Sequence, residues 1–219
     1  MQLFNSTTKV TSKARSLERE PTAVNGLLTR VRSEVSRRGR GSVIAFTSAN
    51  GGEGVSHVVQ FFAEKLAMQT GQRTVLLDAS RLRDLRVADF VNTTGCFVQT
   101  SVPNLWLLAK EFEVEGASEQ TEQGRGWQED AEWGLDPLQA LTATFTYTLI
   151  DCPSLAASYD AEMLAPDVDG VVLVVAADRT KRDQILRARR TIEMANGKLT
   201  GLVLNRRRHV VPEWIYRKL

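Results

Sequence analysis

The sequence predicts an α/β fold with three layers, in which helices cover both faces of a doubly wound, mostly parallel sheet. Apolar runs alternate with segments of helical periodicity along most of the 219 residues, which is typical of such folds. Gly170–Ala176 is a continuous apolar run, as expected for a strand that is buried on both faces. A glycine-rich loop, Ser48–Ser56, follows the first apolar run and precedes an amphipathic helix.

One strand–loop–helix–strand segment organises this prediction. Val43–Thr47 is predicted as a strand, the loop Ser48–Ser56 reads SANGGEGVS, and Thr74–Leu77 is predicted as a second strand that ends at Asp78. The intervening helix has an apolar face made of Val59, Phe62, Ala63, Leu66 and Ala67. This is the layout of a phosphate-binding unit, in which backbone N–H groups and a helix N-terminus attract phosphate.

The remaining elements complete the alternation. The chain divides into a flexible polar tail (1–21), one domain (22–205) and a basic, aromatic C-terminal tail (206–219). In order, we predict a helix over 22–36, helix or loop over 83–94, a strand over 104–108, an acidic surface loop over 111–133, a helix over 137–144, a strand over 147–150, a helical segment over 161–165, the strand Gly170–Ala176 and a strand over 199–204. The last helix should bury Ile185, Ala188, Ile192 and Ala195, with Asp178 or Thr180 as its cap.

Composition and charge narrow the function classes. A net charge of +2 gives no overall field that attracts nucleic acid, so none is expected as a partner. Cys96 and Cys152 form no disulfide framework and no zinc-ligand pattern, which favours a reducing cytosol. No apolar stretch approaches the roughly 20 residues that span a bilayer, and the first residues lack the apolar core of a signal peptide. We therefore expect a cytoplasmic protein.

Polar residues follow several of the predicted strands. Asp78, Asp151 and Asn205 each come at the carboxyl end of a strand, as does the loop Ser48–Ser56. Ligands of open α/β sheets bind beyond these carboxyl ends. The sequence therefore predicts one site at this edge of the sheet.

Five motifs carry a resemblance to a known family. They are TSANGGEGVS at Thr47–Ser56, VLLDAS at Val75–Ser80, LIDCP at Leu149–Pro153, DGVVLVV at Asp169–Val175 and GLVLN at Gly201–Asn205. In this order they resemble the bacterial tyrosine kinases of capsule and exopolysaccharide synthesis. These kinases belong to the deviant P-loop group that also contains the septum-positioning and chromosome-partitioning ATPases. The resemblance covers most of the chain and implies a P-loop NTPase-like fold.

The resemblance also implies roles for individual residues. Asp78 and Asp151 match carboxylates that serve catalysis and Mg²⁺ binding, and Ser56 matches a hydroxyl that ligates the same ion. Asn205 matches the asparagine that reads the adenine edge. The implied nucleotide site comprises Asn50, Gly51, Gly52, Glu53, Gly54, Val55, Ser56, His57 and Asn205.

The sequence departs from the family at important positions. Val55 stands in place of the lysine that binds phosphate, and Asn50 in place of the signature lysine of the partitioning ATPases. His57 replaces a threonine, and Ser80 replaces a second aspartate. The kinases' oligomerisation motif before the first strand is not evident. The C-terminal segment contains one tyrosine, Tyr216, where the kinases have a tyrosine-rich tail that is their own substrate.

The loss of the lysine has a chemical consequence. A charge-assisted hydrogen bond to phosphate contributes about 1.5–3 kcal/mol to binding, and charge stabilisation matters more in the transition state. ATP or ADP with Mg²⁺ is therefore expected to bind weakly or not at all, and the glycines are also compatible with a plain strand-to-helix turn. Arg81, Arg83 or a residue from a partner chain are alternative sources of the missing cation.

Three functional interpretations follow. The first is a degenerate, pseudokinase-like protein that docks on, or regulates, a membrane polysaccharide copolymerase or chain-length regulator, and so lies peripherally at the inner membrane. The second is an active ATP-dependent tyrosine kinase or ATPase with a different phosphate-binding cation. The third is a positioning-type ATPase. A homo-oligomer is compatible with each, and Cys152 is expected to be a small buried residue rather than a nucleophile.

Overall fold

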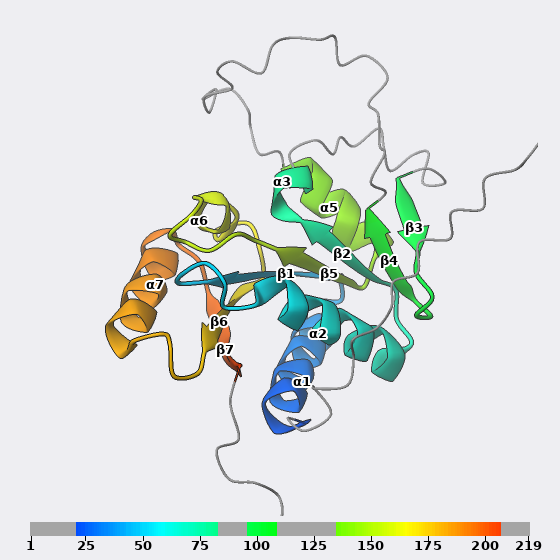
Figure 1. Cartoon of the computed structure of the whole chain (residues 1–219). Coiled ribbons are helices and arrows are strands. Elements are labelled where there is room, and N and C mark those ends of the chain that lie inside the picture. Colours follow the sequence, from blue (N-terminus) through cyan, green and yellow to red (C-terminus); the bar gives the residue numbers. More distant parts are fainter. Residues whose placement is uncertain (1–20, 83–95, 109–134, 207–219) are drawn as a thin grey trace, which may run out of the picture.

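A seven-stranded sheet forms the middle of the molecule (Figure 1). The computed structural model describes residues 21–82, 96–108 and 135–206. The strand order is β3-β4-β2-β5-β1-β6-β7, and every neighbouring pair is parallel except β3 with β4. The elements are α1 (Pro21–Arg38), β1 (Ser42–Ser48), α2 (Val55–Thr70), β2 (Thr74–Asp78), α3 (Ala79–Leu82), β3 (Phe97–Gln99), β4 (Leu105–Leu108), α5 (Leu135–Thr144), β5 (Tyr147–Asp151), α6 (Asp160–Leu164), β6 (Gly170–Ala176), α7 (Arg182–Met194) and β7 (Leu199–Asn205).

Two hydrophobic cores lie on opposite faces of the sheet. On one face α1 and α2 pack against the strands, with Leu28 and Phe62 among the buried residues. On the other face α3, α5, α6 and α7 pack, with Leu141, Leu164 and Ile192 buried. Because alternate residues of a strand point to opposite faces, the fully buried strands β1 and β6 contribute to both cores. The predicted three-layer α/β fold is therefore confirmed.

Most predicted elements are present with small shifts at their ends. The helix before β1 begins at Pro21, which the sequence analysis placed in the flexible tail, and it continues to Arg38. Proline is favoured in the first turn of a helix because its missing N–H would have no partner there. The short antiparallel strand β3 was not predicted, since its three residues show no periodicity and are half-buried or exposed. No helix in the described ranges has both the length and the apolar character needed to cross a bilayer.

The predicted cap of the last helix is wrong. Helix α7 begins at Arg182 after Lys181, whose backbone N–H donates to the Gln184 side-chain oxygen at 2.9 Å. Asp178 lies before this point with a left-handed backbone (φ 62°), and the Thr180 hydroxyl accepts the Ala176 N–H at 3.1 Å. Asp178 and Thr180 therefore form part of the turn that follows β6 and do not cap α7.

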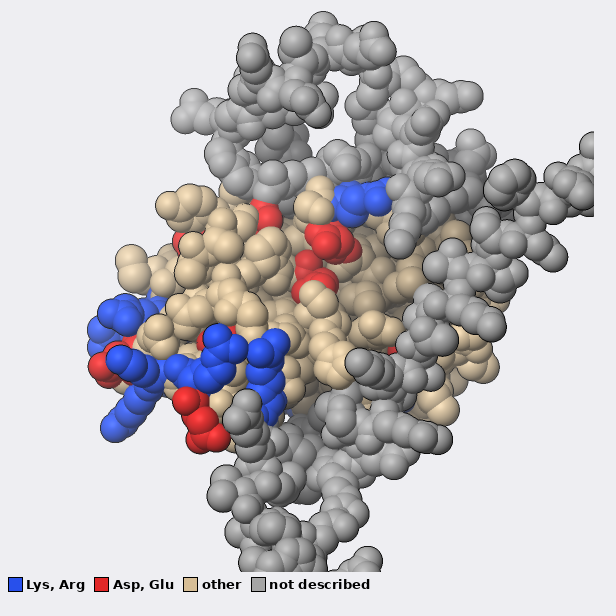
Figure 2. Space-filling view, viewed as in Figure 1, with Lys and Arg blue, Asp and Glu red and all other residues tan. Residues whose placement is uncertain are grey.

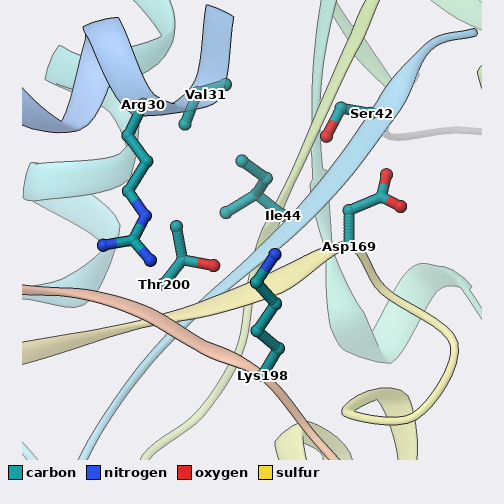
Figure 3. A pocket seen from close by; sticks show the side chains of 7 residues that line it. All are labelled: Arg30, Val31, Ser42, Ile44, Asp169, Lys198 and Thr200. Atoms are coloured by element: carbon teal, nitrogen blue, oxygen red, sulfur yellow. The ribbon is translucent and has the colours of Figure 1, made fainter. Parts of the chain in front are cut away.

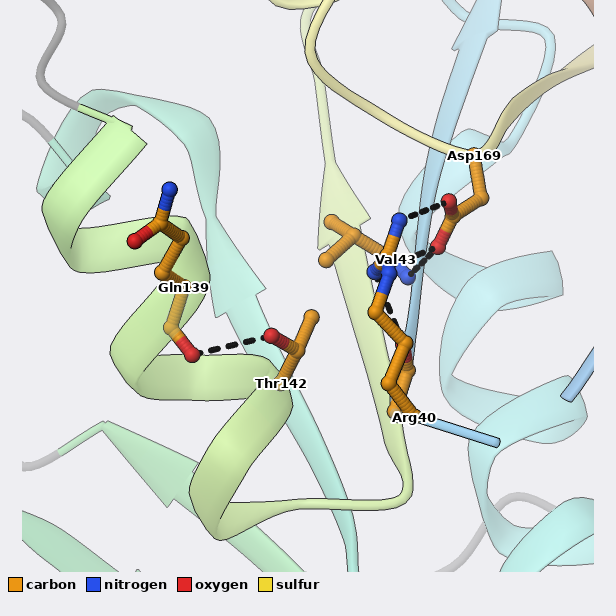
Figure 4. A network of polar contacts seen from close by, with 6 residues as sticks. Arg40, Val43, Gln139, Thr142 and Asp169 are labelled. Atoms are coloured by element: carbon orange, nitrogen blue, oxygen red, sulfur yellow. Dashed lines mark hydrogen bonds and ion pairs between the residues drawn. The ribbon is translucent and has the colours of Figure 1, made fainter. Parts of the chain in front are cut away.

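An ion pair between Arg40 and the buried Asp169 holds the beginning of β1 against the beginning of β6 (Figure 4). The Asp169 carboxylate accepts hydrogen bonds from Arg40 Nη2 at 2.7 Å, from Arg40 Nη1 at 3.4 Å and from the Val43 N–H at 2.8 Å. Arg40 is half-exposed, whereas the Asp169 side chain is only 3% exposed. Arg40 thus has a structural role.

Several predictions fall outside the described residues. They are the tail before residue 21, the acidic loop over 111–133, the segment 83–94 with Arg83, and the C-terminal tail beyond Arg206 with Tyr216.

Candidate functional site

The carboxyl ends of the central strands bring the predicted site residues together. Strand β5 lies between β2 and β1, and Asp151 is in register with Asp78 of β2 and with Phe46 of β1. The loop that follows β1 starts two residues after Phe46. The Ser56 hydroxyl donates a hydrogen bond to the Asp151 carboxylate. The hydroxyl and the two carboxylates that the family resemblance matches to Mg²⁺ ligands therefore lie close together.

The glycine loop has the backbone that its sequence requires. Gly52 and Gly54 adopt left-handed conformations with φ of 77° and 88°, which few other residues tolerate. A Cβ at Gly54 would also lie 2.5 Å from Asn205 Nδ2. Around Gly51 and Gly52 a Cβ would meet nothing within 4 Å, so that part of the loop is open to solvent. The loop is thus shaped as a cradle with free space above it.

The Val55 side chain packs in the hydrophobic core. Val55 is the first residue of α2, is 9% exposed and packs in the core beneath α2 with Val58 and Val59. His57, two residues further along α2, is exposed on the helix surface. Val55, which the family resemblance matches to a phosphate-binding lysine, is therefore an apolar residue packed in the core.

Glu53 is the functional-site residue whose role the sequence analysis missed. Its side chain is 4% exposed. Its Oε2 atom accepts the backbone N–H groups of Ala49 at 3.1 Å and of Asn50 at 3.4 Å, and its Oε1 atom accepts the Thr180 hydroxyl. This buried carboxylate therefore joins the glycine loop to the turn before α7. A charged residue between two glycines was the available signal.

Asn205 completes the connection from β7. Its Nδ2 atom donates to the Glu53 carbonyl at 2.9 Å and to the Gly54 carbonyl at 3.5 Å. The side-chain amide of Asn205 thus holds the glycine loop in place through two loop carbonyls. Its contact with an adenine edge stays a prediction. Asn50 Oδ1 accepts a hydrogen bond from Gln184 of α7 at 3.4 Å, so the loop contacts two later parts of the chain.

The two aspartates make the site acidic. Burial raises the pKa of the Asp151 carboxyl above its ordinary value, the Ser56 hydrogen bond lowers it, and the negative charge of Asp78 raises it. Asp78 accepts both the backbone N–H of Ser80 at 2.8 Å and its hydroxyl at 2.6 Å. Ser80, which the family resemblance matches to a second aspartate, therefore orients the Asp78 carboxylate.

These groups fit a magnesium ion only in part. Mg²⁺ prefers oxygen ligands, and in nucleotide sites one or two carboxylates hold it together with water and phosphate oxygens. Ser56, Asp78 and Asp151 supply such oxygens, but no group of three or more acidic, histidine or cysteine side chains gathers in the described part of the chain. If bound, Mg²⁺ would neutralise negative charge on the phosphates of a nucleotide. Phosphate oxygens and water would have to supply the ligands that Ser56, Asp78 and Asp151 do not.

Two further predicted residues can be placed. Arg81 lies on the short helix α3, three residues after Asp78. Cys152 is 2% exposed and carries no disulfide. Burial, and secondarily the charges of Asp151 and Asp78, raise the pKa of the Cys152 thiol, so it stays protonated and does not act as a nucleophile.

The raised pKa of Asp151 predicts a dependence of stability on pH. The folded protein disfavours the charged carboxyl, so stability that is present below the ordinary value of 3.8 is lost as pH rises through the folded-state pKa. Asp151→Asn removes this ionisation and can still accept the Ser56 hydrogen bond. We expect the variant to gain melting temperature relative to the wild type as pH rises from acidic to neutral. The exposed Asp167→Asn is the control, and an equal difference at all pH values would contradict the prediction.

A small hollow lies near the beginnings of β1, β6 and β7, at the ends of the strands opposite to this site (Figure 3). Its lining residues are Arg30, Val31, Ser42, Ile44, Asp169, Lys198 and Thr200. Its volume is about 10 Å³, which is room for one water molecule. The Ser42 hydroxyl is buried there without a hydrogen-bond partner among the described residues. A water molecule suits this hollow, and a nucleotide does not.

Comparison with known proteins supports the resemblance drawn from the motifs. No protein-family model matches the chain. The tyrosine-protein kinase CpsD of Streptococcus agalactiae is 25% identical over 214 residues, covering 90% of this chain and 88% of that protein. The tyrosine-protein kinase YwqD of Bacillus subtilis is 27% identical over 175 residues, covering 74% of this chain and 71% of that protein.

Solved structures share the fold. The kinase domain of the Escherichia coli tyrosine kinase ETK superposes with a TM-score of 0.57 at 15% identity, covering 87% of this chain and 78% of that one. A plasmid partition protein of Borrelia burgdorferi, solved bound to AMPPNP, gives a TM-score of 0.53 at 14% identity, covering 82% of each chain. The chain is therefore a relative of the bacterial tyrosine-protein kinases, with the fold of the ParA- and MinD-type P-loop ATPases.

Proposed function

We propose that this protein is a non-catalytic relative of the polysaccharide-biosynthesis tyrosine kinases. In this role it keeps the nucleotide-site scaffold and docks on, or regulates, a membrane protein of polysaccharide chain-length control or export. One observation carries the proposal: Val55, at the position of the phosphate-binding lysine, is packed in the core. The domain over residues 22–205 supplies the scaffold, and the partner brings it to the membrane.

Electrostatics support the absence of catalysis. Phosphoryl transfer depends on positioning and on cations that stabilise the charge of the transferring group. Here two carboxylates, Asp78 and Asp151, face the loop, and Val55 offers neither charge nor donor. Losing a charge-assisted hydrogen bond weakens phosphate binding by about 10- to 150-fold, and the rate loss is larger. The remaining cradle can hold a nucleotide weakly at most.

A second candidate is an active ATP-dependent tyrosine kinase or ATPase. It is favoured by the preserved arrangement of Ser56 against Asp151, and by Arg81 three residues after Asp78. In this case Arg81, or an arginine from a partner chain, takes the place of the lysine. A positioning-type ATPase shares this requirement, and its partners would belong to cell division rather than to polysaccharide synthesis.

Phosphate release distinguishes these proposals. With ATP and Mg²⁺, we expect the wild type to release phosphate no faster than Asp151→Ala, because the cation that stabilises the transition state is missing. Isothermal titration with ATP and ADP on the same samples measures the residual binding. Magnesium-dependent turnover in the wild type that Asp151→Ala abolishes would refute the non-catalytic proposal and favour the second candidate.

A further inference from the structure

The carboxyl end of β7 lies against the glycine loop. Asn205, the last residue of the strand, donates its side-chain amide to the carbonyls of Glu53 and Gly54. The next residue, Arg206, therefore follows directly from a point that is fixed on the loop. Its Nε atom lies 3.7 Å from the position that a Cβ at Gly54 would take. The fold thus holds the Arg206 guanidinium beside the glycine loop.

The N–H groups of this guanidinium are available to a ligand. Arg206 is exposed, and among the described residues no hydrogen bond or ion pair engages its side chain. The backbone N–H groups of Gly51, Gly52 and Gly54 also have no acceptor in the described ranges, and the space around Gly51 and Gly52 is open. Backbone N–H groups of such loops and guanidinium groups both donate to phosphate oxygens. The loop therefore offers donors for phosphate, with a further donor group beside it.

Arg206 also adopts a backbone conformation that is unusual for its residue type. Its φ is 59°, in the left-handed region that glycine adopts readily and that a residue with a Cβ rarely adopts. Unfavourable backbone conformations of this kind cluster at ligand-binding sites. A glycine would suit the backbone better here, yet the position carries a long charged side chain that lies next to the loop.

Basic residues are found on one side of the loop. In the strand order, β6 and β7 follow β1 on one side, whereas β5 and β2, which carry the two site aspartates, lie on the other. The hydrogen bond between Thr180 and Glu53 holds the turn after β6 against the loop, and the neighbours of Thr180, Arg179 and Lys181, are exposed. Figure 2 shows Lys and Arg side chains gathered over α7 and the adjoining end of the sheet. The loop thus lies between an acidic side and a basic side.

We propose that Arg206 contacts a phosphate group of a nucleotide bound at the glycine loop, and so supplies from β7 a cation that Val55 does not. The guanidinium and the loop N–H groups donate to the same polyphosphate, whose oxygens carry the negative charge. The inference rests on the nucleotide-site scaffold of the proposed function, to which it adds a phosphate-binding residue. It requires no phosphoryl transfer.

Three ligands test which group Arg206 contacts. Isothermal titration of the full chain compares ATP, inorganic tripolyphosphate and adenosine at low and high salt. At low salt, Arg206→Gln should weaken the binding of ATP and of tripolyphosphate by about tenfold, because it removes a charged donor to phosphate. The binding of adenosine should not change. High salt should reduce the difference between wild type and variant, because salt screens an exposed contact.

Matched variants separate the phosphate contact from other effects of substitution. Arg206→Lys keeps the charge but not the planar pair of donors, so it should lose less affinity than Arg206→Gln. Arg206→Gly suits the left-handed backbone, so it should weaken binding as Arg206→Gln does while keeping the melting temperature of the wild type. Arg187→Gln removes an equal charge from the exposed surface of α7 and should leave affinity nearly unchanged.

Three outcomes would overturn the inference. Equal affinity of the wild type and Arg206→Gln for ATP and tripolyphosphate would place the phosphates away from Arg206. Failure of the wild type to bind either ligand would show that the loop and the guanidinium form no anion site. Weaker adenosine binding by Arg206→Gln with unchanged tripolyphosphate binding would place Arg206 against the base. Magnesium-dependent phosphate release would refute the non-catalytic function while leaving the Arg206 contact intact, so the two proposals fail separately.

Discussion

Val55→Lys should strengthen ATP binding by about 10- to 150-fold without producing tyrosine kinase activity. The aliphatic part of a lysine at this position can follow the path of Val55 along the core while its ammonium group rises to the open loop. There it would form the charge-assisted hydrogen bond to phosphate that the wild type lacks, contributing about 1.5–3 kcal/mol. Full activity is not expected, because Ser80 still replaces the second carboxylate and Tyr216 is the one tyrosine of the C-terminal segment.

The matched control for this prediction is Val55→Met. Methionine also extends an unbranched chain from the first position of α2, but it carries no charge. Both variants lose valine packing in the core, so their melting temperatures separate the packing effect from the nucleotide effect. Isothermal titration with ATP should distinguish lysine from methionine. If both variants bind ATP as weakly as the wild type, the loop is only a turn, and if lysine restores tyrosine phosphorylation, the rest of the site is intact.

The sequence predicted those parts of the fold in which local pattern and burial agree. The continuous run Gly170–Ala176 is a strand with every residue buried, and the stripe from Ile185 to Ala195 faces the core as expected. The glycine loop was located because Gly52 and Gly54 need a backbone that other residues avoid. Hydrophobic patterning and the backbone freedom of glycine both act among residues that are close in sequence, so the sequence alone reveals them.

Long-range contacts could not be read in this way. Thr180 resembles a helix cap in sequence, yet its hydroxyl is used by Glu53, 127 residues earlier. Asn205 braces the loop around Gly54, and this contact depends on the positions of β1 and β7 in the finished sheet. Leu202 and Leu173 are in register, yet Leu202 is exposed on the last strand of the sheet while Leu173 is buried on the interior strand β6, so their exposure depends on the strand order. Residues that act through distant partners are therefore the ones that sequence reasoning misplaced or missed.

Gly41→Ala should destabilise the fold by roughly 1–3 kcal/mol, although no sequence motif singles out this glycine. Gly41 is buried immediately before β1, and an added Cβ would lie 2.3 Å from the Phe145 carbonyl oxygen and 2.5 Å from that of Thr142. Both are backbone atoms at the end of α5, so relief requires the helix end to move away from the sheet.

Gly26→Ala is the matched control for this last prediction. Gly26 lies in α1, where an added Cβ meets nothing within 4 Å, so alanine should stabilise the helix by about 0.5–1 kcal/mol. Both changes restrict the unfolded chain equally, hence their difference reports the native state. Chemical denaturation measures it. Equal free energies of unfolding for the two variants would show that the end of α5 moves away at no cost, which would contradict the prediction. A much lower value for Gly41→Ala would show that close packing of α5 fixes the start of β1, the strand that leads into the glycine loop.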